Sequence, residues 1–201
     1  MVNAMLYEVP WDKTEEAAEA TASAFIGAGC PIGTFVFGNE PDPPALERKL
    51  YRSLVTACSK KVVIHGTSPA LEALSIWFPP GVDHSEDVDP DPFSADEFTD
   101  KKTMGKLEAV NNVIEALTGN LCEEPQWYLH LVAVRPQFTG RGYASQLVRP
   151  MLARAERDGL PCTLITQTMD NVHLYERWGF QVVTEMAVPG SREKFCSMRK
   201  D

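Results

Sequence analysis

The sequence of 201 residues predicts an α/β fold in which helices alternate with the strands of a sheet. Two apolar runs are the main evidence: residues 127–134 (WYLHLVAV) and 160–166 (LPCTLIT) are nearly continuous, which is typical of strands covered on both faces. Helical patterns follow each run, at about 142–157 and 171–179; Asp170 can cap the second helix, and glycines close both of them. The chain then ends in two further strands, FQVVTEMAV and REKFCSMRK.

The first 44 residues predict a strand, a helix and a loop. Residues 4–9 (AMLYEV) suit a short strand. Residues 12–28 suit a helix, because Asp12 can act as its N-cap with Glu15 three residues on, and glycines mark its end. The stretch 30–44 (CPIGTFVFGNEPDPP) is rich in Gly and Pro, which favours a loop.

A helix and two strands are predicted next. Residues 44–59 place leucines and a valine on one helical face. Strands at 61–66 (KVVIHG) and 73–79 (ALSIWFP) follow, and Gly-Thr-Ser-Pro forms a plausible turn between them.

Residues 80–100 hold eight acids and no Lys or Arg. They predict a loop leading into a helix at about 94–118, with Ser94 as cap and Glu97 at the third helical position. A hydrated surface is one interpretation of the acids. The other is a rim that attracts cationic amines, since a cleft of one charge sign concentrates counter-ions.

Composition excludes several classes of protein. The net charge of −9 argues against a nucleic-acid binder, whose affinity comes from clustered cations. No apolar run approaches the roughly 20 residues that cross a bilayer, and no secretory signal is recognisable, so we expect a cytoplasmic protein with no membrane partner. The five cysteines form no CxxC pair and the four histidines no HExxH pattern, so we expect no metal site, and buried thiols at most of Cys30, Cys58, Cys122, Cys162 and Cys196.

A glycine-rich loop stands where the strand 127–134 passes into the next helix. In Gln137–Ala144 (QFTGRGYA), glycines leave backbone N–H groups uncovered at the positive end of a helix dipole, which makes an anion site. Arg141 adds a cation. The spacing matches neither GxxxxGK[ST] nor GxGxxG, so nucleoside triphosphates and dinucleotides are poorly supported. A glycine turn that merely packs is the alternative.

Two motifs resemble one enzyme family. The segment Gln137–Gly142 resembles the QxxGxG/A acyl-CoA motif of the GNAT (Gcn5-related) N-acetyltransferase superfamily, and Asn171–Phe180 resembles its NxxxYExxGF element. Within the superfamily, residues 127–200 are most similar to the puromycin N-acetyltransferases. The resemblance implies a mixed, mostly antiparallel central sheet with helices on both faces, a helical insertion at about 80–120 before the central strand, and one domain spanning 1–201.

The resemblance also implies acetyl-CoA as cosubstrate and a set of residues that bind it. The sheet would splay after the strand 127–134 and admit the pantetheine arm, and the loop amides would bind the pyrophosphate. Asn171 would hydrogen-bond the pantetheine region, unless it only starts a helix. The cofactor-binding residues are then Val132, Ala133, Val134, Thr139, Gly140, Arg141, Gly142, Tyr143, Ala144 and Asn171.

For catalysis, the resemblance makes Tyr175 the general acid that protonates the departing thiolate, and the Val132 N–H the oxyanion donor. Packing on the sheet is the alternative role of Tyr175. The general base is less defined. Strand alternation puts His130 on the face of Val132 and Val134. The ordinary pKa of a histidine suits removing a proton from an ammonium group near neutral pH. A structural role for His130 is the alternative, with Glu108, Glu115 or a water chain as base.

The expected activity is direct acetyl transfer from acetyl-CoA to a primary amine of a small molecule. Trp77, Phe78, Trp127 and Tyr128 are candidates either for an aromatic acceptor pocket or for the core. Alternatives are a protein-lysine or N-terminal acetyltransferase and a non-catalytic acyl-CoA-binding module. We expect a monomer or homodimer, with no nucleic-acid partner.

Overall fold

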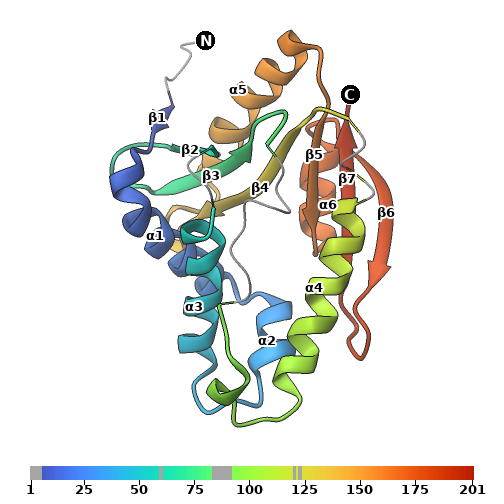
Figure 1. The fold of residues 1–201 in the computed structure, drawn as a ribbon. Helices are drawn as coiled ribbons and strands as arrows, with labels where there is room; N and C mark the ends of the chain where they lie inside the picture. Colours follow the sequence, from blue (N-terminus) through green and yellow to red (C-terminus); the bar gives the residue numbers. More distant parts are fainter. Residues whose placement is uncertain (1–5, 59–60, 83–91, 120, 122–123) are drawn as a thin grey trace.

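The computed structural model describes residues 6–58, 61–82, 92–119, 121 and 124–201. These residues contain a seven-stranded sheet of order β1-β2-β3-β4-β5-β7-β6, with helices on both faces (Figure 1). Only β4 and β5 pair in parallel; the other neighbours are antiparallel. The mixed, mostly antiparallel sheet predicted from the sequence is therefore confirmed.

The strands lie close to their predicted positions. They are β1 Tyr7–Glu8, β2 Val63–Gly66, β3 Ala73–Phe78, β4 Trp127–Val134, β5 Cys162–Thr166, β6 Gln181–Ala187 and β7 Lys194–Lys200. The helices in the described residues are α1 Thr14–Ala28, α2 Pro31–Phe37, α3 Pro43–Thr56, α4 Thr103–Gly119, α5 Tyr143–Asp158 and α6 Met169–Glu176. Three 3₁₀ turns are η1 Trp11–Lys13, η2 Ala95–Glu97 and η3 Pro136–Phe138.

Two features of the N-terminal region differ from prediction. Asp12 is not a helix cap: it lies in η1, and α1 begins at Thr14 after that turn. The predicted loop after α1 is wrong, because Pro31 takes the first position of the helix α2, where a missing N–H costs nothing. Ile32, Val36 and Phe37 then bury one side of α2 against α4.

No single helix in the described part of the chain has both the length and the apolar composition to cross a membrane. The pair Trp11–Ile26 and Pro31–Phe37, bent by 89°, passes the same test of length and composition when taken together.

The segment before α4 also starts differently from the prediction. Ser94 and Glu97 do form the expected capping box, but it caps the short turn η2, and α4 begins only at Thr103. Most of the acidic residues predicted as a loop or rim, those within 83–91, lie outside the described residues.

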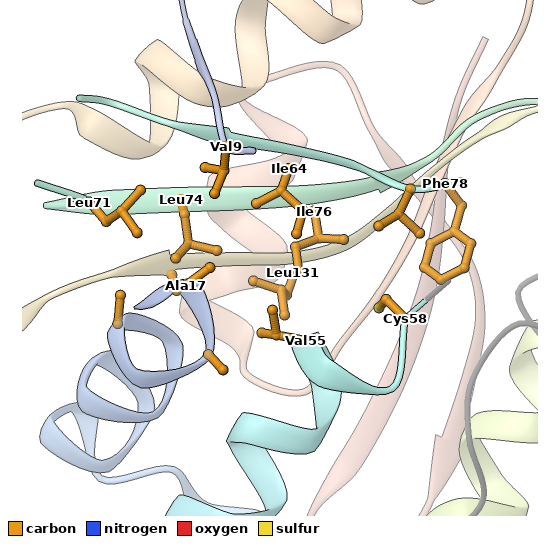
Figure 2. Packing of buried hydrophobic residues seen from close by; sticks show 14 of the residues in the cluster. Val9, Ala17, Val55, Cys58, Ile64, Leu71, Leu74, Ile76, Phe78 and Leu131 are labelled. Atoms are coloured by element: carbon orange, nitrogen blue, oxygen red, sulfur yellow. The ribbon is translucent and has the colours of Figure 1, made fainter. Parts of the chain in front are cut away.

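The sheet is covered on both faces, which explains the continuous apolar run of β4. On one face, α1 and α3 pack on β2, β3 and β4 through residues such as Ala17, Val55 and Leu131 (Figure 2). On the other face, α5 and α6 pack through residues such as Val148 and Val172. The central strands therefore present side chains to a dry core in both directions.

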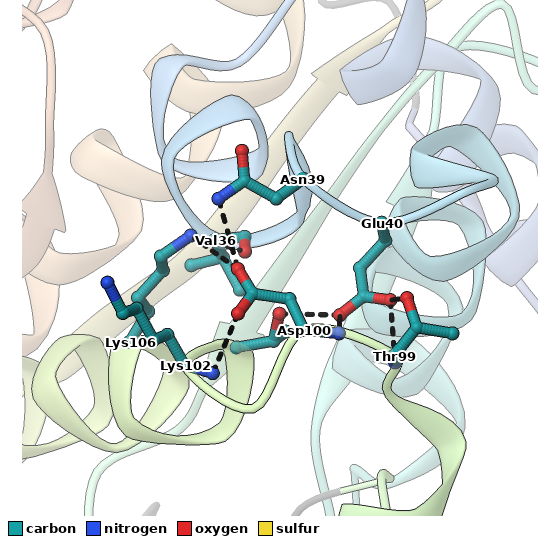
Figure 3. A network of polar contacts seen from close by, with 8 residues as sticks. Val36, Asn39, Glu40, Thr99, Asp100, Lys102 and Lys106 are labelled. Carbon is teal, nitrogen blue, oxygen red and sulfur yellow. Dashed lines mark hydrogen bonds and ion pairs between the residues drawn. The ribbon is translucent and has the colours of Figure 1, made fainter.

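A buried carboxylate between α2 and α3 connects these two helices to the start of α4. The Glu40 side chain is 6% exposed and accepts hydrogen bonds from Thr99 N (2.9 Å), Thr99 Oγ1 (2.8 Å), Asp100 N (3.1 Å) and Thr103 Oγ1 (2.6 Å) (Figure 3). The hydrogen bond from Thr103, and then those from Thr99 and Asp100, hold the pKa of Glu40 below its ordinary value. This fixes the α2–α3 corner against the insertion, a long-range contact without a sequence motif.

Candidate active site

The sheet opens along one side of β4. On the other side, β4 pairs with β3 from Tyr128–Phe78 to Val134–Ala73. Its pairing with β5 covers only Trp127, Leu129 and the residue between them, opposite Cys162–Leu164. Beyond this point, Ile165 and Thr166 of β5 pair with β7. The second half of β4 therefore borders an opening between two neighbouring strands, as the resemblance implied.

A β-bulge decides which backbone groups face this opening. Ile76 pairs with Leu131 and Trp77 with Leu129, so His130 is an extra residue on β4. Arg135 N donates to Glu72 O at 3.0 Å, and antiparallel pairs alternate between bonded and non-bonded. The N–H and C=O groups of Val132 and Val134 consequently point away from β3, toward the opening.

A cavity of about 490 Å³ lies at the opening. It brings together six residues that the sequence analysis had singled out, from β4, α5 and α6: Val132, Ala133, Val134, Ala144, Asn171 and Tyr175. The pantetheine-binding and catalytic candidates of three separate segments therefore share one wall of one cavity.

The glycine loop supplies backbone donors at the start of α5. Gly140 and Gly142 have φ of 75° and 79°, a region that favours glycine, and Gly142 is the N-cap of α5 without a capping side chain. Gln146 N is the amide that bonds to Gly142 O, so the amides of Tyr143, Ala144 and Ser145 precede the first intrahelical bond. A Cβ at either glycine would meet no protein atom within 4 Å. The loop thus offers exposed donors beside open space, which fits an anionic group.

Two side chains of this loop are held by local contacts. The exposed Arg141 donates from Nη2 to Gln137 O at 3.2 Å, and its guanidinium lies 5.3 Å from the Phe138 ring. Thr139 Oγ1 donates to Pro136 O at 2.9 Å. Arg141 therefore places a positive charge at the loop. The contacts described for its guanidinium include no ion pair.

Tyr175 and Asn171 lie on α6, one turn apart. The Tyr175 ring packs edge-on against Trp178 (5.6 Å) and Phe180 (5.8 Å), and burial raises the pKa of its hydroxyl to about 12. The helix is capped by Thr168, whose Oγ1 accepts from Asn171 N at 3.3 Å. Asp170 is therefore not the cap that we expected from the sequence. It lies in the first turn and lines the cavity.

His130 lies elsewhere. Its Nε2 is 3.1 Å from Leu54 O on α3, and its ring packs edge-on against Phe78 at 5.4 Å. The alternation that placed His130 on the face of Val132 fails because the bulge shifts the alternation at that residue. His130 does not occur among the described residues that line the cavity.

The other candidates from the sequence also lie outside this cavity. The four aromatic residues proposed either for an acceptor pocket or for the core are buried in the core: Trp77, Phe78, Trp127 and Tyr128. Glu108 and Glu115 are exposed on α4. Within the described ranges, no three His, Cys, Asp or Glu side chains gather as metal ligands. Cys58, Cys162 and Cys196 are buried as expected, and Cys122 lies outside the described residues.

The sequence analysis missed the wall opposite β4 and α6. It is formed where α1 passes into α2, and Gln167 borders it after β5: Phe25, Ala28, Gly29, Cys30, Pro31 and Gln167. Cys30 Sγ donates to Gln167 Oε1 at 3.4 Å and is half-buried. The Cys-Pro pair ahead of an apolar i, i+4 pattern was the signal for α2 that could have located this wall.

Comparisons with known proteins agree with this geometry. Residues 70–180, more than half of the chain, match the model of a family described as "Acetyltransferase (GNAT) family". A stretch of 58 residues is 33% identical to an uncharacterized N-acetyltransferase of Schizosaccharomyces pombe. That match covers 29% of this chain and only 24% of the yeast protein.

Solved structures share the fold over nearly the whole chain. Drosophila melanogaster polyamine N-acetyltransferase has a TM-score of 0.61 at 14% identity, with 97% of this chain and 98% of that chain covered. Aedes aegypti arylalkylamine N-acetyltransferase 2 also has 0.61 at 14% identity, with 98% and 97% covered. A Corynebacterium glutamicum protein described as histone acetyltransferase HPA2 and related acetyltransferase has 0.59 at 17%, with 98% and 94% covered. At these identities the likeness establishes the fold.

Proposed function

Because the chain belongs to the acetyltransferase (GNAT) family, we propose that it transfers an acetyl group directly from acetyl-CoA to a primary amine of a small molecule. The observation that carries the proposal is the opening between β4 and β5. It brings outward-facing backbone groups and Tyr175 to one cavity, which Ala144 also lines, two residues after Gly142 of the glycine loop.

The residues of the opening fit acetyl-CoA. The amides at the start of α5 and the exposed Arg141 suit a pyrophosphate, because both are hydrogen-bond donors and the helix dipole favours an anion there. The backbone groups of Val132 and Val134 suit the amides of a pantetheine arm, as an added strand would be bound. Asn171 lines the same cavity and offers a side-chain amide.

When bound, acetyl-CoA supplies a thioester carbonyl for attack and a sulfur leaving group. In our proposal the Val132 N–H donates to the carbonyl oxygen as negative charge develops on it. As the C–N bond forms and the C–S bond breaks, the Tyr175 hydroxyl donates its proton to the departing sulfur, and it is protonated again from solvent, which receives the proton that the amine nitrogen loses. Burial raises the pKa of this hydroxyl to about 12, so it is protonated at neutral pH. Direct attack by the amine needs no protein nucleophile, so no cysteine receives that role.

Small amines are the acceptors that the comparisons support. Two proteins of the same fold are named for polyamine and arylalkylamine acceptors. The resemblance of residues 127–200 to puromycin N-acetyltransferases adds antibiotic-like and other xenobiotic amines to the acceptors worth testing. We further propose a single domain, because strands from both ends of the chain join one sheet. As expected from the sequence, we also propose that the protein is cytoplasmic and monomeric or homodimeric.

Calorimetric titration with acetyl-CoA, followed by a thiol-release assay over a panel of amines, tests the proposal. We expect micromolar binding and acetylation of free amines. Activity on peptides exceeding that on free amines would favour a protein acetyltransferase instead. Binding without transfer to any amine or peptide would favour a non-catalytic acyl-CoA-binding module, and saturating acetyl-CoA that gives no heat at two temperatures would overturn the enzyme assignment.

Replacing Tyr175 by Phe tests the general acid. We expect turnover to fall by about 10²- to 10⁴-fold while acetyl-CoA affinity stays nearly intact, because the ring contacts remain and only the proton donor is lost. Since the pKa of Tyr175 is about 12, the hydroxyl stays protonated up to about pH 10, and the ratio of wild-type to variant turnover should be constant from about pH 7 to pH 10. Unchanged turnover would remove Tyr175 from the mechanism.

A further inference from the structure

The cavity has two walls of different character. The wall of β4, α5 and α6 holds Val132, Val134, Asn171 and Tyr175, the groups proposed to hold and activate the acetyl donor. The opposite wall, at the junction of α1 and α2, carries none of the residues that either motif indicated. A donor held along β4 leaves this second wall to the acceptor amine.

An aromatic surface dominates the second wall. Phe25 of α1 lines the cavity, and its ring stacks on Tyr51 of α3 with centroids 4.8 Å apart and planes at 20°. Tyr51 is 5% exposed, so the Phe25 ring is backed by a buried ring and cannot withdraw into the core. The Phe25 ring is therefore a flat, supported surface of the kind on which apolar groups stack.

Polar groups lie next to Tyr51, the residue that packs behind Phe25. Burial, together with the neighbouring Cys30 and Glu47, raises the pKa of Tyr51, so this phenol is neutral. Cys30 neighbours Tyr51, and Cys30 Sγ donates to Gln167 Oε1 at 3.4 Å. Cys30 and Gln167, which line the cavity, carry no formal charge, so they add no ion-pairing site to the wall.

Charge is scarce in the cavity. Of the described residues that line it, Asp170 alone carries a formal charge at neutral pH, and it lies on α6 rather than on the second wall. The remaining lining around Phe25 is small and apolar: Ala24, Ala28 and Pro31. An ammonium group placed there without a partner would pay a large desolvation cost.

From these observations we infer that the acceptor is a primary monoamine with an aromatic or other apolar body that stacks on Phe25, and that polyamines are selected against. This inference rests on the proposed acetyl transfer and narrows its substrate class. A monoamine delivers its nitrogen to the acetyl group and its apolar body to the wall. A polyamine must place an additional ammonium group along the second wall, where the described lining carries no carboxylate.

Steady-state kinetics with 2-phenylethylamine, 1,4-diaminobutane and spermidine test the inference. We expect kcat/KM for 2-phenylethylamine to exceed both others by at least about tenfold. A preference for either polyamine, or equal values, would overturn the inference and leave the proposed acetyl transfer standing. Acetyl-CoA binding with no transfer to any amine would instead overturn the proposed function.

Variants at Phe25 separate recognition from folding. We expect Phe25→Ala to raise KM for 2-phenylethylamine by about tenfold, with KM for acetyl-CoA unchanged, because only the second wall is altered. Phe25→Asp should shift the kcat/KM ratio toward 1,4-diaminobutane, since the new carboxylate can pair with its second ammonium. Equal losses for both amines, or a raised KM for acetyl-CoA, would show that Phe25 does not select the acceptor.

Phe35→Ala is the matched control. Phe35 lies on α2, is half-buried in the cluster beside α4, and does not occur among the described lining residues. We expect its substitution to lower stability without changing the ratio of kcat/KM between the two amines. A similar change in that ratio for both Phe variants would assign the effect to helix packing and overturn the inference.

Discussion

The two edges of β4 have different roles. On the β3 side, pairing continues to Val134 and joins the strand to the core of the sheet. On the β5 side, pairing stops after Leu129, and the cavity begins. His130, the extra residue of the bulge, lies between Leu129, the last residue of β4 that pairs with β5, and Leu131. One strand can therefore be a central element of the fold and still keep backbone groups available for a ligand.

The comparison teaches that alternate residues of β4 have separate roles. Leu131 and Ala133 bond to β3, whereas Val132 and Val134 present their backbone to the opening. The hydrogen-bond donors of β4 at this site are backbone N–H groups, since valine and alanine have no polar side chain. The strongest tests therefore act on the backbone.

A loss of acetyl-CoA binding is expected from Gly142→Val, at the start of α5, two residues before Ala144 of the cavity lining. Gly142 has a φ of 79°, which a β-branched residue adopts only with strain, so the loop is expected to leave the conformation that exposes its amides. We expect acetyl-CoA affinity, measured by calorimetry, to fall at least about hundredfold.

Gly159→Val is the matched control for that variant. Gly159 ends the same helix with a φ of 67°, and a Cβ there also meets nothing within 4 Å, so the backbone strain is comparable. Gly159 lies at the opposite end of α5 from Ala144, which lines the cavity. Normal affinity in the Gly142 variant, or an equal loss in both, would mean that the anion site is not at the start of α5.

A pair of proline substitutions compares the two sides of β4 directly. Val132→Pro removes an N–H that faces the opening, and we expect turnover to fall by about 10²- to 10³-fold through the lost oxyanion donor. Ala133→Pro removes an N–H that bonds to β3, and we expect it to lower the free energy of unfolding by about 1–3 kcal/mol more than Val132→Pro does. Urea unfolding and initial rates measure both; the reverse order of stability would contradict the assigned alternation.

The smallest effect is expected at the bulge. His130→Ala should leave turnover within about threefold of wild type, because the imidazole is held against Leu54 O on the α3 side. A hundredfold loss, with a pH profile whose acid limb moves, would restore His130 as the general base despite its position. The same assay with exogenous imidazole would then be expected to recover activity.

The sequence predicted the C-terminal half of the fold better than the N-terminal half. Residues 127–134 and 160–166 are nearly continuous apolar runs, because both faces of these strands are largely buried, and this pattern is visible without the structure. Gly159 marked the end of α5 correctly, since it is the C-cap of that helix with a φ of 67°. The predicted end at Gly179 is wrong, because α6 ends at Glu176, three residues earlier. The helix α2 was missed because glycines and prolines obscure a helix of seven residues whose stability comes from burial against α4.

The candidate site, too, was predicted from the sequence only in part. The glycine loop and α6 are local signals, and the structure places Ala144, Asn171 and Tyr175 at one cavity with Val132. The position of His130 could not be predicted, because a bulge depends on the register of two strands that are distant in sequence. The helix cap moved from Asp170 to Thr168 for a local reason: the Thr168 hydroxyl reaches the amide of Asn171.

The sequence by itself thus determined the α/β class, the buried strands and the glycine loop, because these depend on periodicity and on glycine positions along the chain. The mostly antiparallel sheet and the segment of Tyr175 were expected from the resemblance to the GNAT family. The tertiary structure alone decided where β4 and β5 part, which amides face the opening, and that Phe25, backed by Tyr51, forms the second wall of the cavity. These features arise from strand register and helix packing between residues far apart in the chain. Their energies are set by three-dimensional neighbours that no local pattern records.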